Sequence, residues 1–252
     1  DVLGSRGLGD VYKRQKYGVR ILLSSQCLPA CTFAEYPTTT TDQMDLADEA
    51  ASINAALDSL EEALSLYPEG FFPQFRSEFG DGGIRIMLVG GFESNFNMIG
   101  YSVQNSLWHN IYVDIFSEGL VGTYCHEIWH ATEDHITSIN YGEFDVVQWA
   151  ELNPDGFQYI FDPAESILNE GDYTYFGSTK PKDCYFIDGY AKTNEREDRA
   201  RIMEYAMTGF FGSELSEYPH LYAKLRYMSD KIRQYFDTTG WNTPRWEDAL
   251  GE

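Results

Sequence analysis

The feature that most constrains the fold is a pair of histidines spaced for one turn of helix. His126 and His130 enclose Glu127 in the pattern H-E-x-x-H, within TYCHEIWHATEDHI at 123–136. Residues four apart on a helix lie about 40° apart around its axis, so both imidazoles can reach one tetrahedral ion. Glu127 lies about 100° round from His126, where its carboxylate can hold a metal-bound water without being a ligand. The pattern therefore predicts a helix over about 120–135 that carries a metal site.

The rest of the chain predicts several helices and a small sheet. Apolar residues recur at three- and four-residue steps in the expected helices and alternate in the expected strands. The helices are expected at 40–68, about 195–210 and 218–237, and the strands at 82–92 and 105–119. Residues 137–186 carry little periodicity. We therefore expect one α+β domain over 42–252, with a small sheet, the H-E-x-x-H helix and further helices toward the C-terminus.

A catalytic metal site needs a third protein ligand and one position open to water. His135 is the nearest candidate, but it lies nine residues after His126. That spacing places it about 180° round the same helix, so it is rejected. The metzincin pattern requires a glycine and a histidine at positions where this chain has Glu133 and Ile136. The third ligand is therefore expected from another part of the chain.

A stretch at 189–206, GYAKTNEREDRARIMEYA, resembles the ligand-bearing helix of gluzincin zinc metallopeptidases. In their anthrax-lethal-factor-like (ATLF-like) branch, that helix opens with a pattern close to Y-A-x-T-N-x-x-E-D-x-A-E. This chain reads Y-A-K-T-N-E-R-E-D-R-A-R at 190–201. It also resembles zinc-binding metallopeptidases found among bacterial lipoproteins. The resemblance implies a zincin fold of the minimal gluzincin kind, Zn²⁺ as the cofactor and Glu197 as the third ligand. It also implies Tyr190 as the phenol that hydrogen-bonds the developing oxyanion.

The chain departs from the gluzincin pattern four residues after the ligand glutamate. Gluzincins usually have an aspartate or glutamate there, which orients a zinc-bound histidine. This chain has Arg201 at that position. Glu204, seven residues after Glu197 and on the same helix face, either substitutes for the missing carboxylate or pairs with Arg201.

The resemblance implies a reaction as well as a site. We expect hydrolysis of peptide bonds by a zinc-activated water, with Glu127 as the general base. The strand at 107–116 is expected to lie along the cleft and to pair with an extended peptide substrate. Two alternatives stay open: a zincin-fold protein that binds metal or peptide without catalysis, and a lipoprotein in which the motif is accidental.

Acidic residues dominate the charge of the chain. It has 18 basic and 40 acidic residues, which give a formal net charge of −22. Nucleic-acid binding calls for a basic face, so this balance argues against a nucleic-acid partner. It also argues against electrostatic attraction to an anionic membrane surface. We expect a monomer that acts on a peptide or protein substrate.

The N-terminal residues carry signals of processing. DVYKRQ at 10–15 matches the in-frame translation of a transposase adapter, so 1–15 is set aside as a sequencing-adapter artefact. Residues 16–31 resemble a truncated lipoprotein signal that ends in LPAC, with Cys31 as the lipidated residue and membrane attachment point. Residues 32–41 then form a polar tether. This predicts an extracytoplasmic location, as a cell-surface lipoprotein or a secreted protein. The alternative is that the segment is an ordinary N-terminal strand or a disordered leader.

Overall fold

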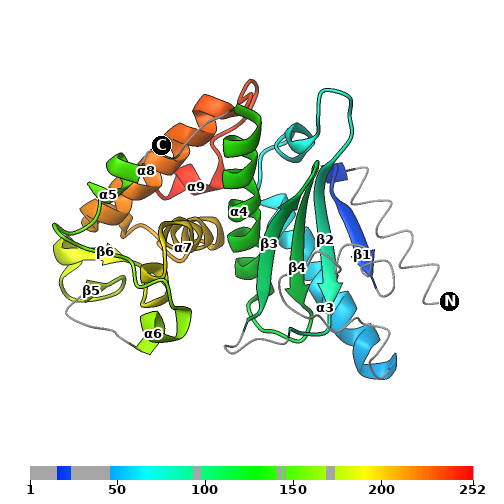
Figure 1. The fold of residues 1–252 in the computed structure, drawn as a ribbon, viewed down its shortest axis with the longest axis horizontal. Coiled ribbons are helices and arrows are strands. Elements are labelled where there is room, and N and C mark those ends of the chain that lie inside the picture. Colours follow the sequence, from blue (N-terminus) through cyan, green and yellow to red (C-terminus); the bar gives the residue numbers. More distant parts are fainter. Residues whose placement is uncertain are drawn as a thin grey trace. The chain divides into compact units, whose positions relative to one another are not determined.

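The structure is a computed structural model that describes residues 16–23, 46–92, 98–140, 144, 146–168 and 174–251. It is a mixed α+β structure with a small four-stranded sheet, a two-stranded sheet and helices, as the sequence predicts (Figure 1). Contacts group the chain into two compact units, Asp1–His135 and Ile136–Glu252. The first holds the larger sheet, and the second holds the C-terminal helices.

The larger sheet has the strand order β1-β2-β4-β3. Its strands are β1 (Arg20–Leu23), β2 (Gly83–Val89), β3 (Gly100–Asn105) and β4 (Trp108–Asp114). β2 pairs in parallel with both β1 and β4, whereas β3 and β4 form an antiparallel hairpin. The apolar residues of β2 are buried on both faces of the sheet, which is the pattern of a strand in a parallel arrangement. The expected strands at 82–92 and 105–119 are thus confirmed as β2 and β4.

The structure corrects the expected role of the strand at 107–116. β4 is paired on both of its edges, with β2 on one side and β3 on the other. Its backbone groups are already hydrogen-bonded, so the expectation that this strand pairs with a substrate is wrong. Among the described strands of this sheet, β1 and β3 are the edge strands, and β3 is the edge strand next to β4.

Residues 16–23 are part of the first unit. β1 pairs with β2 in the register Ile21↔Ile86, and the side chains of Val19, Ile21 and Leu22 are buried. Ahead of the strand, the Tyr17 hydroxyl donates to Glu61 Oε1 at 2.8 Å. This stretch of the predicted signal therefore forms a strand with a buried apolar face. The predicted adapter segment 1–15, Cys31 and the tether at 32–41 lie outside the described residues.

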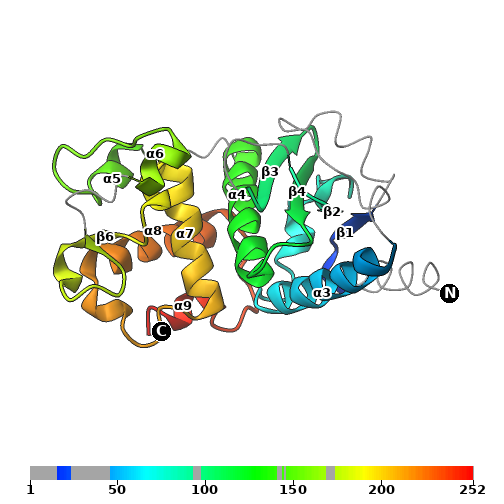
Figure 2. The same ribbon diagram turned by 90° about the horizontal axis from the view of Figure 1, so that it is seen from below.

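Two long helices begin in the first unit. α3 (Leu46–Ser65) confirms the amphipathic helix expected at 40–68, and it buries Ile53, Ala56, Leu60, Ala63 and Leu64. α4 (Leu120–Asn140) carries the H-E-x-x-H pattern and runs one turn past its expected end, across the boundary between the units. The Tyr124 hydroxyl of α4 donates to the Ala56 carbonyl of α3 at 3.1 Å, so the two helices are joined directly. Figure 2 shows the course of both helices. A short 3-10 helix, η3 (Phe72–Phe75), precedes β2.

The second unit contains several short elements and two longer helices. The short elements are α5 (Val146–Ala150), α6 (Pro163–Leu168), β5 (Thr174–Tyr175), η4 (Pro181–Asp183), β6 (Cys184–Phe186), η5 (Tyr190–Lys192), η6 (Leu215–Glu217) and α9 (Arg245–Asp248). α7 (Glu195–Thr208) and α8 (Pro219–Tyr235) confirm the two expected C-terminal helices. α7 packs against η5, α8 and α9. In the described part of the chain, no helix is both long enough and apolar enough to cross a membrane.

Candidate metal centre

The two histidines of the H-E-x-x-H pattern project from one side of α4. Their ring centroids lie 4.9 Å apart, and the ring planes are inclined by 78°. His126 is 8% exposed and His130 is 7% exposed. Each imidazole is therefore mostly withdrawn from water, and the spacing of one helical turn brings the two rings together, as the sequence predicts.

Glu197 is held in the first turn of α7 by a side-chain cap. Asn194 is the N-cap residue, with φ −160° and ψ 171°. Its Oδ1 accepts hydrogen bonds from the backbone N–H groups of Arg196 at 2.9 Å and Glu197 at 3.0 Å. An asparagine at this position satisfies donors that a helix start otherwise leaves unpaired. The T-N-x-x-E part of the sequence pattern is thus a helix start that places Glu197 at its third residue.

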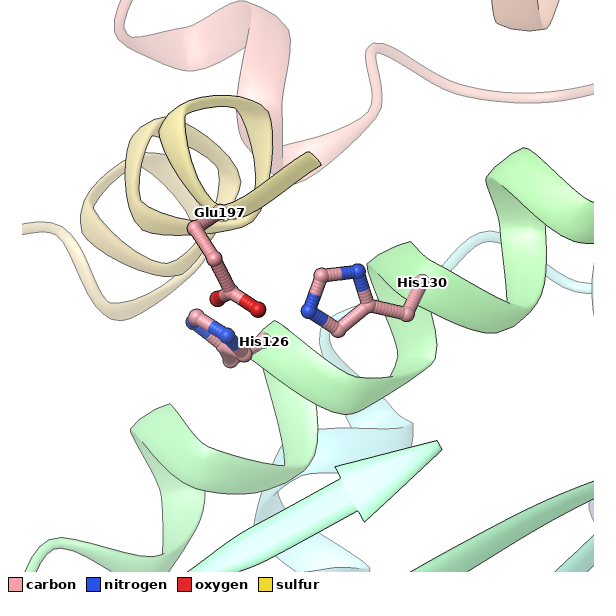
Figure 3. A group of neighbouring side chains, drawn as sticks. All are labelled: His126, His130 and Glu197. Atoms are coloured by element: carbon pink, nitrogen blue, oxygen red, sulfur yellow. The ribbon is translucent and has the colours of Figure 1, made fainter. Parts of the chain in front are cut away.

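His126, His130 and Glu197 form a group that could hold a metal ion (Figure 3). One ligand atom from each side chain lies within 4.8 Å of the other two. A tetrahedral zinc ion with bonds of about 2.1 Å holds its ligand atoms about 3.4 Å apart, which is within the 4.8 Å limit of this group. Two imidazole nitrogens and a carboxylate oxygen also suit zinc chemically. Over the described residues, no other histidine, cysteine or carboxylate group meets this criterion.

His135 lies in a different environment, as its helical position predicts. Its ring centroid is 4.6 Å from that of Phe75 and 5.7 Å from that of His109. Both histidines are at most 4% exposed. Burial lowers the pKa of His109 and that of His135 to about 4, and the charge of His109 contributes to the shift of His135. His135 is therefore a neutral core residue at physiological pH.

Glu127 is 5% exposed and lies beside a strand that leaves room for its side chain. A Cβ atom at Gly100, the first residue of β3, would lie 3.1 Å from Glu127 Oε1. It would also lie 3.0 Å from Thr123 Cγ2 and 3.1 Å from the Tyr112 carbonyl oxygen. These separations are tight for carbon, so glycine at this position leaves space for the Glu127 carboxylate. Sequence reasoning missed Gly100; a glycine within the strand-like run GYSVQN was the available signal.

Tyr190 opens the 3-10 helix η5, which leads through Thr193 and Asn194 into α7. It is half-buried and lies seven residues before Glu197. η5 packs against α7, so the tyrosine and the glutamate belong to one continuous structural segment. Tyr190 is not one of the three grouped ligands.

Arg201, the departure from the gluzincin pattern, is paired with carboxylates on both sides. Its Nη1 contacts Glu204 Oε2 within α7, which confirms the pairing that was one of the two expected outcomes. Its Nε and Nη2 donate to Asp188 Oδ2 at 3.0 Å and 2.6 Å. Asp188 was not identified from the sequence, because its partner is thirteen residues away and only the fold joins them.

A buried ion pair directly follows the candidate ligand. Asp198 Oδ2 lies 2.7 Å from Lys224 Nζ, and both side chains are fully buried. Lys224 also donates to the Tyr185 carbonyl at 2.8 Å, and the Tyr159 hydroxyl donates to Asp198 Oδ2 at 2.9 Å. Buried charges require such partners, so this network ties α7 to α8 next to Glu197. The sequence signal was a lysine between Leu221 and Leu225 on the apolar stripe of α8.

The chain was compared with protein-family models, with curated proteins and with solved structures, and no match was found in any of the three.

Proposed function

We propose that the protein is a zinc-dependent peptidase of the gluzincin type. The observation that carries this proposal is the grouping of His126, His130 and Glu197 within 4.8 Å. Two histidines and one glutamate form the ligand set of thermolysin-type catalytic zinc sites, which keep a fourth position for water. The pattern H-E-x-x-H and a ligand glutamate on a later helix support the same assignment.

Glu127 and Tyr190 each have a role in this proposal. A bound zinc ion would supply a Lewis acid that makes water nucleophilic near neutral pH. Glu127 accepts the proton of the attacking water and passes it to the leaving amine nitrogen. Because Glu127 is 5% exposed, its carboxylate acts where charge interactions are weakly screened. The Tyr190 hydroxyl donates a hydrogen bond to the carbonyl oxygen as that oxygen gains negative charge.

The proposed substrate is an extended peptide or a segment of a protein. β3 leaves one backbone edge unpaired among the described strands, and an extended chain can add to such an edge through main-chain hydrogen bonds. Gly100, at the start of β3, lies next to Glu127, so a peptide on this edge would pass the general base. Action outside the cytoplasm, membrane attachment through Cys31 and a monomeric state stay predictions from the sequence.

Metal analysis combined with cleavage of a peptide library tests the proposed function. We expect about one zinc per chain and cleavage by the wild type. Glu127→Gln should keep the zinc and abolish cleavage, because the residue moves a proton without being a ligand. Glu197→Ala should lower zinc affinity at least about tenfold, whereas the matched control His135→Ala should leave it unchanged.

The same experiment separates the alternatives. A zincin-fold protein that only binds metal or peptide would hold zinc stoichiometrically and cleave no member of the library. An accidental motif would bind no stoichiometric zinc. A loss of zinc in His135→Ala with full retention in Glu197→Ala would contradict the ligand assignment itself.

A further inference from the structure

Asp188 shapes the turn that carries Tyr190. Its Oδ1 accepts a hydrogen bond from the backbone N–H of Ala191 at 3.0 Å. Aspartate often closes a turn in this way, by taking a backbone donor a few residues ahead. Since Ala191 directly follows Tyr190, this bond restrains the backbone on the C-terminal side of the tyrosine.

Gly189, the residue before Tyr190, is restrained by α6. The Ser166 hydroxyl of α6 donates to the Gly189 carbonyl at 2.5 Å. A Cβ at Gly189 would lie 2.9 Å from the Ser166 carbonyl oxygen, so α6 and this turn are in close contact. Both backbone neighbours of Tyr190 are therefore held in place.

The second carboxylate oxygen of Asp188 connects the turn to α7. Arg201 donates to this oxygen through Nε at 3.0 Å and Nη2 at 2.6 Å, while its Nη1 contacts Glu204. The Arg201 side chain is 19% exposed. A guanidinium that donates through two nitrogens sets direction as well as distance, and here it is oriented further by Glu204 on its own helix. Arg201 lies one helical turn beyond Glu197, so the bond relates the tyrosine-bearing turn to the helix that carries the ligand.

We propose that Asp188 and Arg201 are positioning residues that hold Tyr190 relative to Glu197. This inference rests on the proposed peptidase function and on Tyr190 as the oxyanion donor. In the gluzincin pattern, the position of Arg201 carries a carboxylate that orients a zinc-bound histidine. In this chain, the same helix position orients the turn of the tyrosine through Asp188.

The inference predicts a specific kinetic signature. The hydrogen bond from a donor to the developing oxyanion is stronger in the transition state than in the bound substrate. Displacement of the donor therefore lowers kcat with little effect on KM. Removal of one oxyanion donor lowers kcat by roughly a hundredfold to a thousandfold, and misplacement should lower it less. We therefore expect Asp188→Ala to lower kcat about tenfold with zinc content unchanged. Asp188→Asn keeps an acceptor for Ala191 and should fall between Asp188→Ala and the wild type.

A double-mutant cycle in the full chain tests whether Asp188 acts through Tyr190. The variants are Asp188→Ala, Tyr190→Phe and the two combined, with kcat, KM, zinc content and thermal midpoint measured for each. We expect Asp188→Ala to have no further effect on kcat once Tyr190 is phenylalanine, because the hydroxyl that it positions is gone. Asp237→Ala is a matched control, since Asp237 Oδ1 also closes a turn by accepting from Thr239 N–H at 2.9 Å. It should leave kcat unchanged.

Each outcome decides between the two proposals. Equal losses of kcat from Asp188→Ala in the wild-type and Tyr190→Phe backgrounds would overturn the positioning role while leaving the peptidase assignment intact. A wild-type protein that holds zinc and cleaves nothing would overturn the peptidase assignment, and the positioning role with it. If Asp188→Ala fails to fold, Arg201→Lys in the same cycle gives the answer, because lysine keeps the charge and loses the two-nitrogen contact.

Discussion

At the scale of single residues, the candidate site depends on Gly100, which has no side chain, as well as on the side chains of Glu127 and the two histidines. Glu127 and the two histidines share one helix, and their relative positions follow from helical spacing alone. The space for the Glu127 carboxylate comes instead from Gly100 on a strand. The sequence predicts the first kind of relation because it is local. It does not predict the second, because the approach of β3 to α4 depends on the whole hairpin.

Gly100→Ala is expected to displace the general base without releasing the metal. The added methyl group would lie 3.1 Å from Glu127 Oε1, and the side chain rather than the strand backbone is free to give way. We expect kcat to fall at least about tenfold, since proton transfer requires a positioned carboxylate. Zinc content should stay at the wild-type value. Ser102→Ala, on the same strand and without added bulk, serves as the control; unchanged kcat in Gly100→Ala would show that Glu127 tolerates the methyl group.

At the scale of elements, the sequence predicts the helices well and the sheet in part. α3 and α8 are long and periodic, so their apolar spacing locates them. α4 and α7 were located instead by the H-E-x-x-H pattern and by the ligand-helix pattern at 190–201. β3 was not predicted, because its run is short and all of its residues are half-buried, although Tyr101 and Val103 alternate with polar residues. The place of β4 inside the sheet was missed because strand order is set by pairing between distant segments. The link between Asp188 and Arg201 escaped prediction for the same reason.

Three elements also meet at a buried histidine pair, which predicts a pH dependence of stability. His109 of β4, His135 of α4 and Phe75 of η3 pack together. Burial lowers the pKa of each histidine from 6.5 to about 4. Between these values the unfolded chain binds more protons than the folded chain. The free energy of unfolding should therefore be fully retained above pH 6.5 and fall as the pH drops toward 4.

Replacement of both histidines by leucine should flatten this pH dependence. Each shift contributes up to about 3 kcal/mol at the acidic end of the range. We expect the double variant His109→Leu/His135→Leu to lose less stability than the wild type between pH 7 and pH 5. Urea unfolding at the two pH values, with a chelator present so that metal release contributes nothing, measures the difference. Parallel losses in the two proteins would mean that these histidines titrate normally in the folded chain.

At the scale of the whole molecule, two interpretations of the N-terminal segment conflict: a signal that is removed, and a strand of the sheet. A lipoprotein signal that ends before Cys31 is removed during export, and β1 would be removed with it. Yet β1 pairs along its full length with β2, and it buries Ile21 and Leu22 at the edge of the sheet, with Val19 buried just ahead of it. The sheet of the uncleaved chain would therefore contain β1, whereas the sheet of a chain cleaved before Cys31 would lack it.

Deletions measure how much the first unit depends on β1. Removal of 1–15 is expected to leave stability unchanged, because those residues are interpreted as adapter-derived. Removal of 1–23 should lower the free energy of unfolding by several kcal/mol, since each fully buried aliphatic side chain contributes about 1.5–3 kcal/mol. It would also expose the β2 edge, which favours association between chains. Urea midpoints and light scattering of the two deletion variants test both effects. Equal urea midpoints would mean that β1 does not contribute to stability. Cleavage before Cys31 would then leave the stability of the first unit unchanged.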